Sequence, residues 1–178
     1  RHIQAEKLFI TDHPWYKEGY ILEAVNNMPN WIIHWLRSSF INKSEKFECN
    51  EKIFIDRTES TYNHCQIQNN DEIIDFLNKK GFSSYKVGQL SFAQQIHLFK
   101  SAKIIVGAHG AAFANLIFCQ KNTKVVDIKP ISHANYVDEK ISRLNNLDFH
   151  FIETPIIKDE SKKKGDIFLK IEDLKKKL

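Results

Sequence analysis

The sequence predicts a three-layer α/β domain with a mostly parallel sheet. Short apolar runs that suit strands alternate along the 178 residues with stretches in which apolar side chains have helical spacing. This alternation is typical of a parallel sheet covered by helices on both faces. The composition agrees, because 42% hydrophobic and 27% charged residues are ordinary for a globular chain with one sizeable core. Since neither an internal repeat nor a splitting linker is evident, we expect residues 1–178 to form a single domain.

The elements follow in chain order from these patterns. Apolar runs predict strands at residues 7–10, 52–56, 84–87, 103–106, 125–128 and 149–152. Helical spacing predicts helices at residues 31–40, from 69 or 70 up to Gly81, from Ser91 onward, and at 113–118, 136–144 and 172–178. In the helix after Ser91, we expect Phe92, Ile96 and Phe99 to share one apolar face.

Local signals mark the ends of two helices. Asn69 with Glu72, and Ser91 with Gln94, have the spacing of a capping box at a helix N-terminus. Gly81 stands where a glycine commonly ends a helix. We therefore expect helices to begin near residues 69 and 91.

The stretch Gly107-Ala108-His109-Gly110-Ala111-Ala112 separates the strand at 103–106 from an apolar helix. A glycine-lined turn lets the backbone approach a ligand closely, and the helix N-terminus that follows offers unpaired N–H groups to an anion. His109 adds a side chain that is able to donate to a phosphate or to transfer a proton. Because the stretch is not a GxGxxG fingerprint and lacks the P-loop lysine, a tight turn in which the histidine only fills space is an equal alternative.

Ligands of open α/β sheets bind beyond the carboxyl ends of the strands, so residues just after each strand are candidates. A carboxylate in a buried strand is costly unless it is paired or bound, which makes Asp127 a candidate for ribose hydroxyls; pairing with a lysine or capping a turn is the alternative. Arg57 suits a diphosphate, or else is a surface arginine paired with Asp56 or Glu59. The remaining candidates at this edge are Asp12, His13, Thr58, Gly107, Gly110, Ala111 and His133.

Charge and cysteine content argue against several classes of protein. The net charge is +4, its densest lysine clusters lie near the C-terminus, and there are four arginines, so we expect no nucleic-acid partner. Three widely spaced cysteines form no CxxC pair, which argues against a zinc site or a disulfide framework and favours a reducing compartment. No apolar run is long enough to cross a bilayer and no signal peptide opens the chain, which starts at Arg1.

The order of several segments resembles the C-terminal region of glycosyltransferase family 61. The resemblance covers roughly residues 52–148, and its most specific part is the His109-Gly110-Ala111 turn followed by Asn115-Leu116-Ile117-Phe118. The other matching segments are Phe54-Ile55-Asp56-Arg57, Asn69 before a helix, Gly81-Phe82 after it, 90–96 and Val125-Val126-Asp127-Ile128. The family includes bacterial enzymes of capsular-polysaccharide type and eukaryotic O-linked N-acetylglucosamine and xylosyl transferases.

The resemblance implies the C-terminal half of a GT-B enzyme, in which two Rossmann-like domains face each other and one holds a nucleotide-sugar. It carries over Arg57, His109, Gly110 and Asp127 as site residues, with His109 the expected catalytic residue. Three features depart from the family: residues 62–65 where a second arginine is frequent, Asp127 where glutamate is usual, and Asn70 where glutamate follows the asparagine. GT-B enzymes generally act without a bound metal, and the chain has no DxD pair, so we expect neither metal nor cofactor.

The resemblance therefore implies an inverting transfer from a nucleoside-diphosphate sugar to a glycan or other acceptor hydroxyl. The acceptor domain is expected N-terminal to Arg1, with residues 1–45, which include Trp15, Trp31 and Trp35, facing it; packing of these tryptophans in the core is the alternative. We expect a cytoplasmic bacterial enzyme, or a Golgi or endoplasmic-reticulum enzyme if the source is eukaryotic. The other class that we consider is a non-catalytic α/β module that binds a nucleotide or a phosphorylated ligand.

Overall fold

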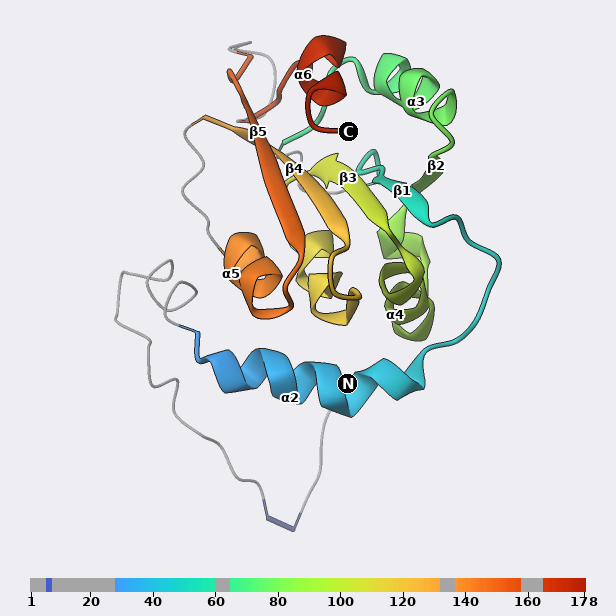
Figure 1. The fold of residues 1–178 in the computed structure, drawn as a ribbon, viewed down its shortest axis with the longest axis vertical. Helices are drawn as coiled ribbons and strands as arrows, with labels where there is room; N and C mark the ends of the chain where they lie inside the picture. The colour runs from blue at the N-terminus through green and yellow to red at the C-terminus, as the bar shows by residue number, and fades with distance from the viewer. Residues whose placement is uncertain (1–5, 8–27, 60–64, 132–136, 158–164) are drawn as a thin grey trace.

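Five parallel strands form the centre of the computed structural model, which describes residues 6–7, 28–59, 65–131, 137–157 and 165–178 (Figure 1). The strand order is β2-β1-β3-β4-β5, and each pairing is parallel. The strands are β1 (Lys52–Ile55), β2 (Ser83–Tyr85), β3 (Ile104–Ala108), β4 (Lys124–Pro130) and β5 (Asp148–Thr154). The expected α/β class and parallel sheet are confirmed. The strand expected at 7–10 and the candidates Asp12, His13 and His133 lie outside the described residues.

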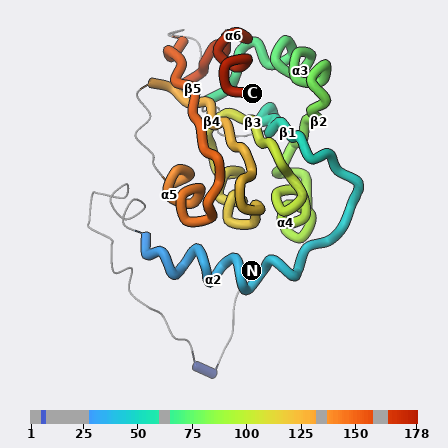
Figure 2. Tube along the Cα trace, in the orientation of Figure 1, coloured from blue at the N-terminus to red at the C-terminus, as the bar shows by residue number. Residues whose placement is uncertain are grey.

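Helices cover both faces of the sheet and complete the three layers (Figures 1 and 2). One face carries α4 (Phe92–Ser101), the 3-10 helix η3 (Ala111–Phe118) and α5 (Val137–Leu144), with α2 (Asn30–Phe40) lying across η3 and α5. The other face carries α3 (Asn70–Asn78) and α6 (Ile171–Lys175). Two short 3-10 helices, η1 (Ile41–Lys43) and η2 (Val87–Gln89), complete the list of described helices. Among the described residues, the helices are too short or too polar to cross a membrane.

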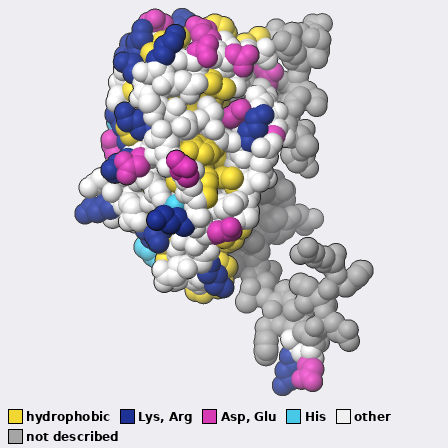
Figure 3. Space-filling view, turned by 90° about the vertical axis from the view of Figure 1, so that its right-hand side faces the viewer, with side chains coloured by type: hydrophobic (Ala, Val, Ile, Leu, Met, Phe, Trp, Pro, Cys, Tyr) yellow, Lys and Arg dark blue, Asp and Glu magenta, His cyan; other side chains and the backbone are white. Residues whose placement is uncertain are grey.

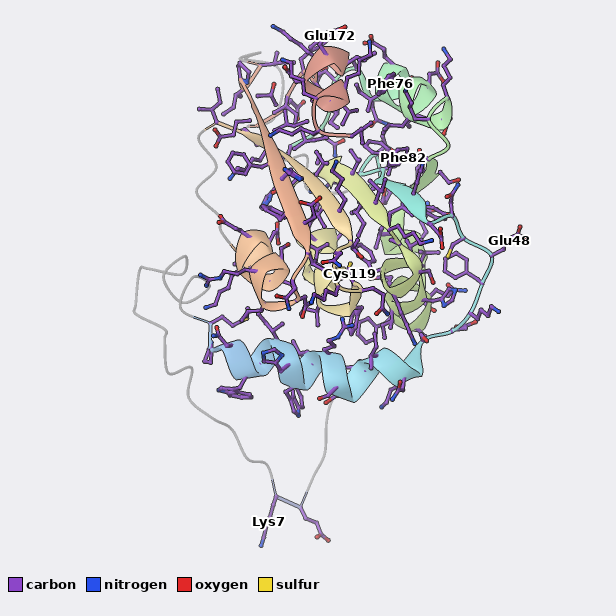
Figure 4. The ribbon with its side chains drawn as sticks, in the orientation of Figure 1. Lys7, Glu48, Phe76, Phe82, Cys119 and Glu172 are labelled. Atoms are coloured by element: carbon purple, nitrogen blue, oxygen red, sulfur yellow. The ribbon has the colours of Figure 1, made fainter. Side chains whose placement is uncertain are left out.

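Side chains of the central strands alternate between two apolar clusters, because successive strand residues point to opposite faces. Ile53, Ile105 and Val125 pack toward η3 and α4, whereas Phe54, Val106 and Val126 pack toward α3 and α6. Figure 4 shows the second cluster through Phe76 and Phe82, and Cys119 lies on the η3 side. Burial on both faces explains why these strands read as continuous apolar runs. On the face drawn in Figure 3, acidic and basic side chains are interspersed around hydrophobic ones.

One of the two predicted capping boxes forms. Ser91 Oγ accepts from the Gln94 N–H at 3.2 Å, while the Ser91 N–H donates to Gln94 Oε1 at 3.0 Å. The prediction of a capping box at Asn69 is wrong. Asn69 Oδ1 accepts from the N–H of Leu169, far along the chain, at 3.1 Å and does not cap the helix that follows it. Gly81 has a φ of +81°, in keeping with its predicted place after α3.

Two strands extend beyond their predicted ends, and this changes the position of two candidate residues. β3 continues through Gly107 and Ala108, so Gly107 is a strand residue beside Ile55 and not part of the turn. β4 continues to Pro130, so Asp127 lies in mid-strand and not at the strand end. Pairing with β1 and β5 extends these strands, and a single-sequence pattern does not carry that information.

Two predicted helical features also differ. The segment after the turn is a 3-10 helix, and its predicted apolar character is confirmed because Phe113 and Leu116 are fully buried. Phe92 is 51% exposed and does not share the buried face of Ile96 and Phe99, since it occupies the first turn of α4, where it contacts the rings of Phe40 and Phe118 from the side.

We expect Gly107→Ala to destabilise the fold by about 1–3 kcal/mol, the usual cost of overpacking a core. The reason is that a Cβ at this position would lie 2.8 Å from the Cβ of Ile55 on the adjacent strand. Urea unfolding measures the change. Ser84→Ala, an exposed change in edge strand β2, is the matched control and should stay within about 0.5 kcal/mol of the parent. Equal midpoints for the two variants would contradict the close contact between the strands.

Candidate functional site

The strand order creates a crevice between the loops that follow β1 and β3. From β1, the chain moves outward to β2 on one side and continues through β3, β4 and β5 on the other. The loops after β1 and β3 therefore diverge at their carboxyl ends, and sheets with this order bind ligands at that point. Arg57 follows β1, and His109 and Gly110 follow β3, so the structure brings these three predicted residues to one place.

A pocket of about 450 Å³ opens at this crevice. Its size lies within the range usual for small-molecule sites. The loops after β1, β2 and β3 and the first turns of α4 and η3 supply its lining, namely Ile55, Arg57, Glu59, Val87, Gly88, Gln89, Gln95, Ala111, Ala112 and Asn115. Of the predicted site residues, Arg57 and Ala111 line it directly.

Arg57 lies directly on the turn after β3. Its guanidinium donates to the carbonyl of His109, and its position would overlap a Cβ at Gly110. Gly110 has an extended backbone, so the close approach of Arg57 and not an unusual φ requires glycine here. Burial lowers the pKa of Arg57, while Glu59 and Asp127 act in the opposite direction, and a guanidinium keeps its charge at any physiological pH.

The first residues of η3 and an amide pair form the part of the wall next to Arg57. Ala111 and Ala112 open η3, and the N–H groups at the start of a helix have no partner within it. Asn115 Nδ2 donates to Gln95 Oε1 at 3.1 Å and to the Ala112 carbonyl at 3.2 Å. Gln95 Nε2 donates to the Leu90 carbonyl at 3.1 Å. These bonds hold η3 against α4, so the helix start keeps a defined position facing Arg57.

Beside this pocket, His109 forms a buried cluster with two carboxylates. Its Nδ1 lies 3.1 Å from Asp127 Oδ2 and 3.1 Å from Asp138 Oδ2, and all three residues are buried. Nδ1 carries one proton, which it donates to Asp127, while Asp138 Oδ2 is within ion-pair distance but outside hydrogen-bond geometry. The cluster joins the end of β3, the middle of β4 and the first turn of α5.

Electrostatics favour an imidazolium in this cluster. Burial alone lowers the pKa of His109, but the hydrogen bond to Asp127 and the charges of Asp127 and Asp138 outweigh it and raise the pKa to about 9. Burial raises the pKa of Asp127, against the opposing effect of His109. These three side chains are of the types that bind divalent cations and their ligand atoms lie within 4.8 Å of one another. A protonated Nδ1 has no lone pair to offer a metal, so protonation of His109 competes with binding of a cation here.

The structure therefore separates residues that the sequence grouped together. Arg57, Gly110 and Ala111 meet at the pocket. Asp127 is 2% exposed, contacts His109 and does not line the pocket. Sequence reasoning missed Asp138, because nothing in its local pattern indicates that it approaches a residue 29 positions earlier. It also treated Glu59 only as an ion-pair partner of Arg57, although Glu59 lines the pocket.

We expect the free energy of unfolding to fall as the pH rises from about 6.5 to 9. The pKa of His109 is about 9 in the folded protein and 6.5 in the unfolded chain, so its contribution is complete below pH 6.5 and disappears as the pH passes 9. The loss is on the order of 3 kcal/mol. Urea unfolding across this range should show the fall in the parent protein and a shallower one in His109→Gln.

His34→Gln, which alters an exposed histidine of α2, is the matched control and should keep the parent slope. Burial raises the pKa of Cys65 to about 12 and also raises that of Cys119, so both thiols reduce stability above about pH 8.5. They do so in every variant, and the difference between variants isolates His109. Two results together would contradict a charged His109 in this cluster. One is a His109 imidazole that titrates near pH 6.5 by NMR, and the other is an equal slope of unfolding free energy against pH in the parent protein and in His109→Gln.

No curated protein matches the chain. The profile of the family Glycosyltransferase 61 matches residues 2–126, which include β1, β2, β3 and the residues that line the pocket. Asp127 and Asp138 lie just beyond the matched segment. Because the match covers most of the chain, the protein belongs to glycosyltransferase family 61.

Proposed function

We propose that this domain binds a nucleoside-diphosphate sugar in the pocket between β1 and β3 and provides the donor half of a glycosyl transfer. The observation that carries the proposal is that Arg57 and the N-terminus of η3 line the same pocket at the sheet's ligand-binding edge. A guanidinium and the unpaired N–H groups at the start of a helix are both groups that bind phosphate. The family membership supports glycosyl transfer as the reaction.

The diphosphate is the leaving group of this reaction, and its developing charge needs stabilisation. Arg57 donates to the diphosphate with its remaining N–H groups, and the N–H groups of Ala111 and Ala112 donate to it from the adjoining start of η3. Such fixed donors stabilise the transition state without reorganising during the reaction. The His109 carbonyl holds Arg57 in place, so the turn and the guanidinium act as one unit.

His109 and Asp127 stabilise the turn after β3, on which the Arg57 guanidinium lies. The imidazolium is buried against two carboxylates, and a side chain that is already protonated at neutral pH is unsuited to act as a general base. We assign His109 the role of holding the turn that carries Gly110 and Ala111. Asp127 then positions His109, and neither residue contacts the base or the sugar.

The acceptor hydroxyl attacks the anomeric carbon from the opposite side, which inverts its configuration, and a general base removes the hydroxyl proton. We place the acceptor and this base on a second, facing domain, as in other GT-B enzymes. Trp31 is 64% and Trp35 is 55% exposed on α2, so these tryptophans do not close the core and remain open to a partner domain.

Arg57→Ala should weaken binding of a nucleoside diphosphate about 10- to 100-fold, the scale of a hydrogen bond to a charged group. Binding of the corresponding nucleoside should change less than twofold, because it has no phosphate. Calorimetry with UDP, GDP, ADP, CDP and dTDP, and then with the matching nucleoside, measures both effects. Lys86→Ala, an exposed change just after β2, is the matched control. Equal losses for nucleotide and nucleoside would show that Arg57 serves the fold or the base.

The domain alone should bind a nucleotide-sugar and yet transfer none. Fast transfer requires the acceptor to be held against the donor, and we place that function on the facing domain. The test incubates the chain with a labelled nucleotide-sugar that it binds and with a mixture of lysate-derived acceptors. Multiple-turnover transfer by this chain would place the general base within its 178 residues and overturn the two-domain arrangement.

A further inference from the structure

A residue that lines the pocket has a buried carboxylate oxygen without a hydrogen-bond partner among the described residues. Glu59 Oε1 accepts from the Gly88 N–H at 3.3 Å, which joins the loop after β1 to the loop after β2. Glu59 Oε2 is buried without a hydrogen-bond partner among the described residues. An unpaired polar atom in such a position costs free energy, and a ligand that donates a hydrogen bond removes that cost. Glu59 is the acidic residue of the pocket lining, so a ligand whose donor group reaches Oε2 removes this cost.

From this we infer that Glu59 accepts hydrogen bonds from the ribose hydroxyls of the bound nucleotide. The inference rests on the proposed function, because it takes the ligand to be a nucleoside diphosphate. Arg57 supplies the positive charge of the same pocket and draws the anionic end of a ligand toward η3. The neutral, hydroxyl-bearing end then falls to the part of the pocket formed by Glu59 and Gly88. A vicinal diol suits a carboxylate, and acids at this edge of α/β sheets commonly bind ribose in this way.

Asp127, the acid that the sequence favoured for the ribose, also has a buried oxygen, Oδ1, without a hydrogen-bond partner among the described residues, but this residue does not reach the pocket. Its Oδ2 accepts from His109, and the residue lies outside the pocket lining. Glu59 is instead held at the pocket wall by a backbone N–H. Gly88 keeps that wall open, since a Cβ there would lie 3.3 Å from Glu59 Oε1. The residue that binds the ribose is thus Glu59, which lies in the loop after β1, two positions beyond Arg57.

The test compares ribonucleotides with analogues that lack the hydroxyls. The probes are UDP, GDP, ADP and CDP, each paired with its 2′,3′-dideoxy analogue. The parent protein should bind the preferred ribonucleotide about tenfold or more tightly than its dideoxy analogue, as expected for hydrogen bonds to a charged acceptor. Glu59→Gln should lose about tenfold affinity for the ribonucleotide and less than twofold for the analogue. Glu51→Gln, at the other end of β1 in an exposed ion pair with Lys103, should change neither.

The possible outcomes separate the inference from the proposed function. Binding of a ribonucleotide that depends on Arg57, but with Glu59→Gln affecting both forms equally, overturns the role of Glu59 and leaves the nucleotide site standing. Failure of all four nucleotides to bind overturns both. If Glu59→Gln does not fold, the parent protein still tests the inference. Equal affinity of the parent for a ribonucleotide and its dideoxy analogue excludes a hydrogen bond from the ribose hydroxyls to the protein.

Discussion

The contact between Arg57 and the turn after β3 is the constraint on which the site depends. It requires two adjacent parallel strands at close spacing, and Gly107 permits that spacing because its lack of a side chain leaves room for Ile55. It also requires Gly110, since any side chain there would occupy the volume of the guanidinium. The two glycines of the turn region therefore have different roles. One sets how closely β3 lies against β1, and the other admits the cation that faces the start of η3.

The charges around this contact are arranged in two separate groups. In the buried group, an imidazolium lies between two carboxylates and links β3, β4 and α5. In the pocket group, Arg57 and the start of η3 supply positive potential, and Glu59 supplies a single acidic side chain. An anionic ligand with hydroxyl groups at its other end fits this distribution, which is the character of a nucleotide. The buried group acts on that ligand only through the turn that it supports.

Local patterns predicted much of the fold, and long-range contacts account for what they missed. The parallel sheet and the Ser91 capping box follow from short segments, so the sequence alone indicated both. The ends of β3 and β4 depend on neighbouring strands, and the Asn69 side chain bonds to a residue 100 positions away. In the site, placing Arg57 and Gly110 together required only their positions after strands. The burial of Asp127 and the unpaired oxygen of Glu59 arise from packing that no local pattern records.

The central claim is that Arg57 and the start of η3 hold a diphosphate between them. The most direct measurement is a crystal structure of the domain with the nucleoside diphosphate that it binds most tightly. We expect phosphate oxygens within hydrogen-bond distance of the Arg57 guanidinium and of the N–H groups of Ala111 or Ala112, with the nucleoside extending toward Gly88. Phosphates bound away from Arg57, or a nucleotide seated outside the pocket between β1 and β3, would contradict the account.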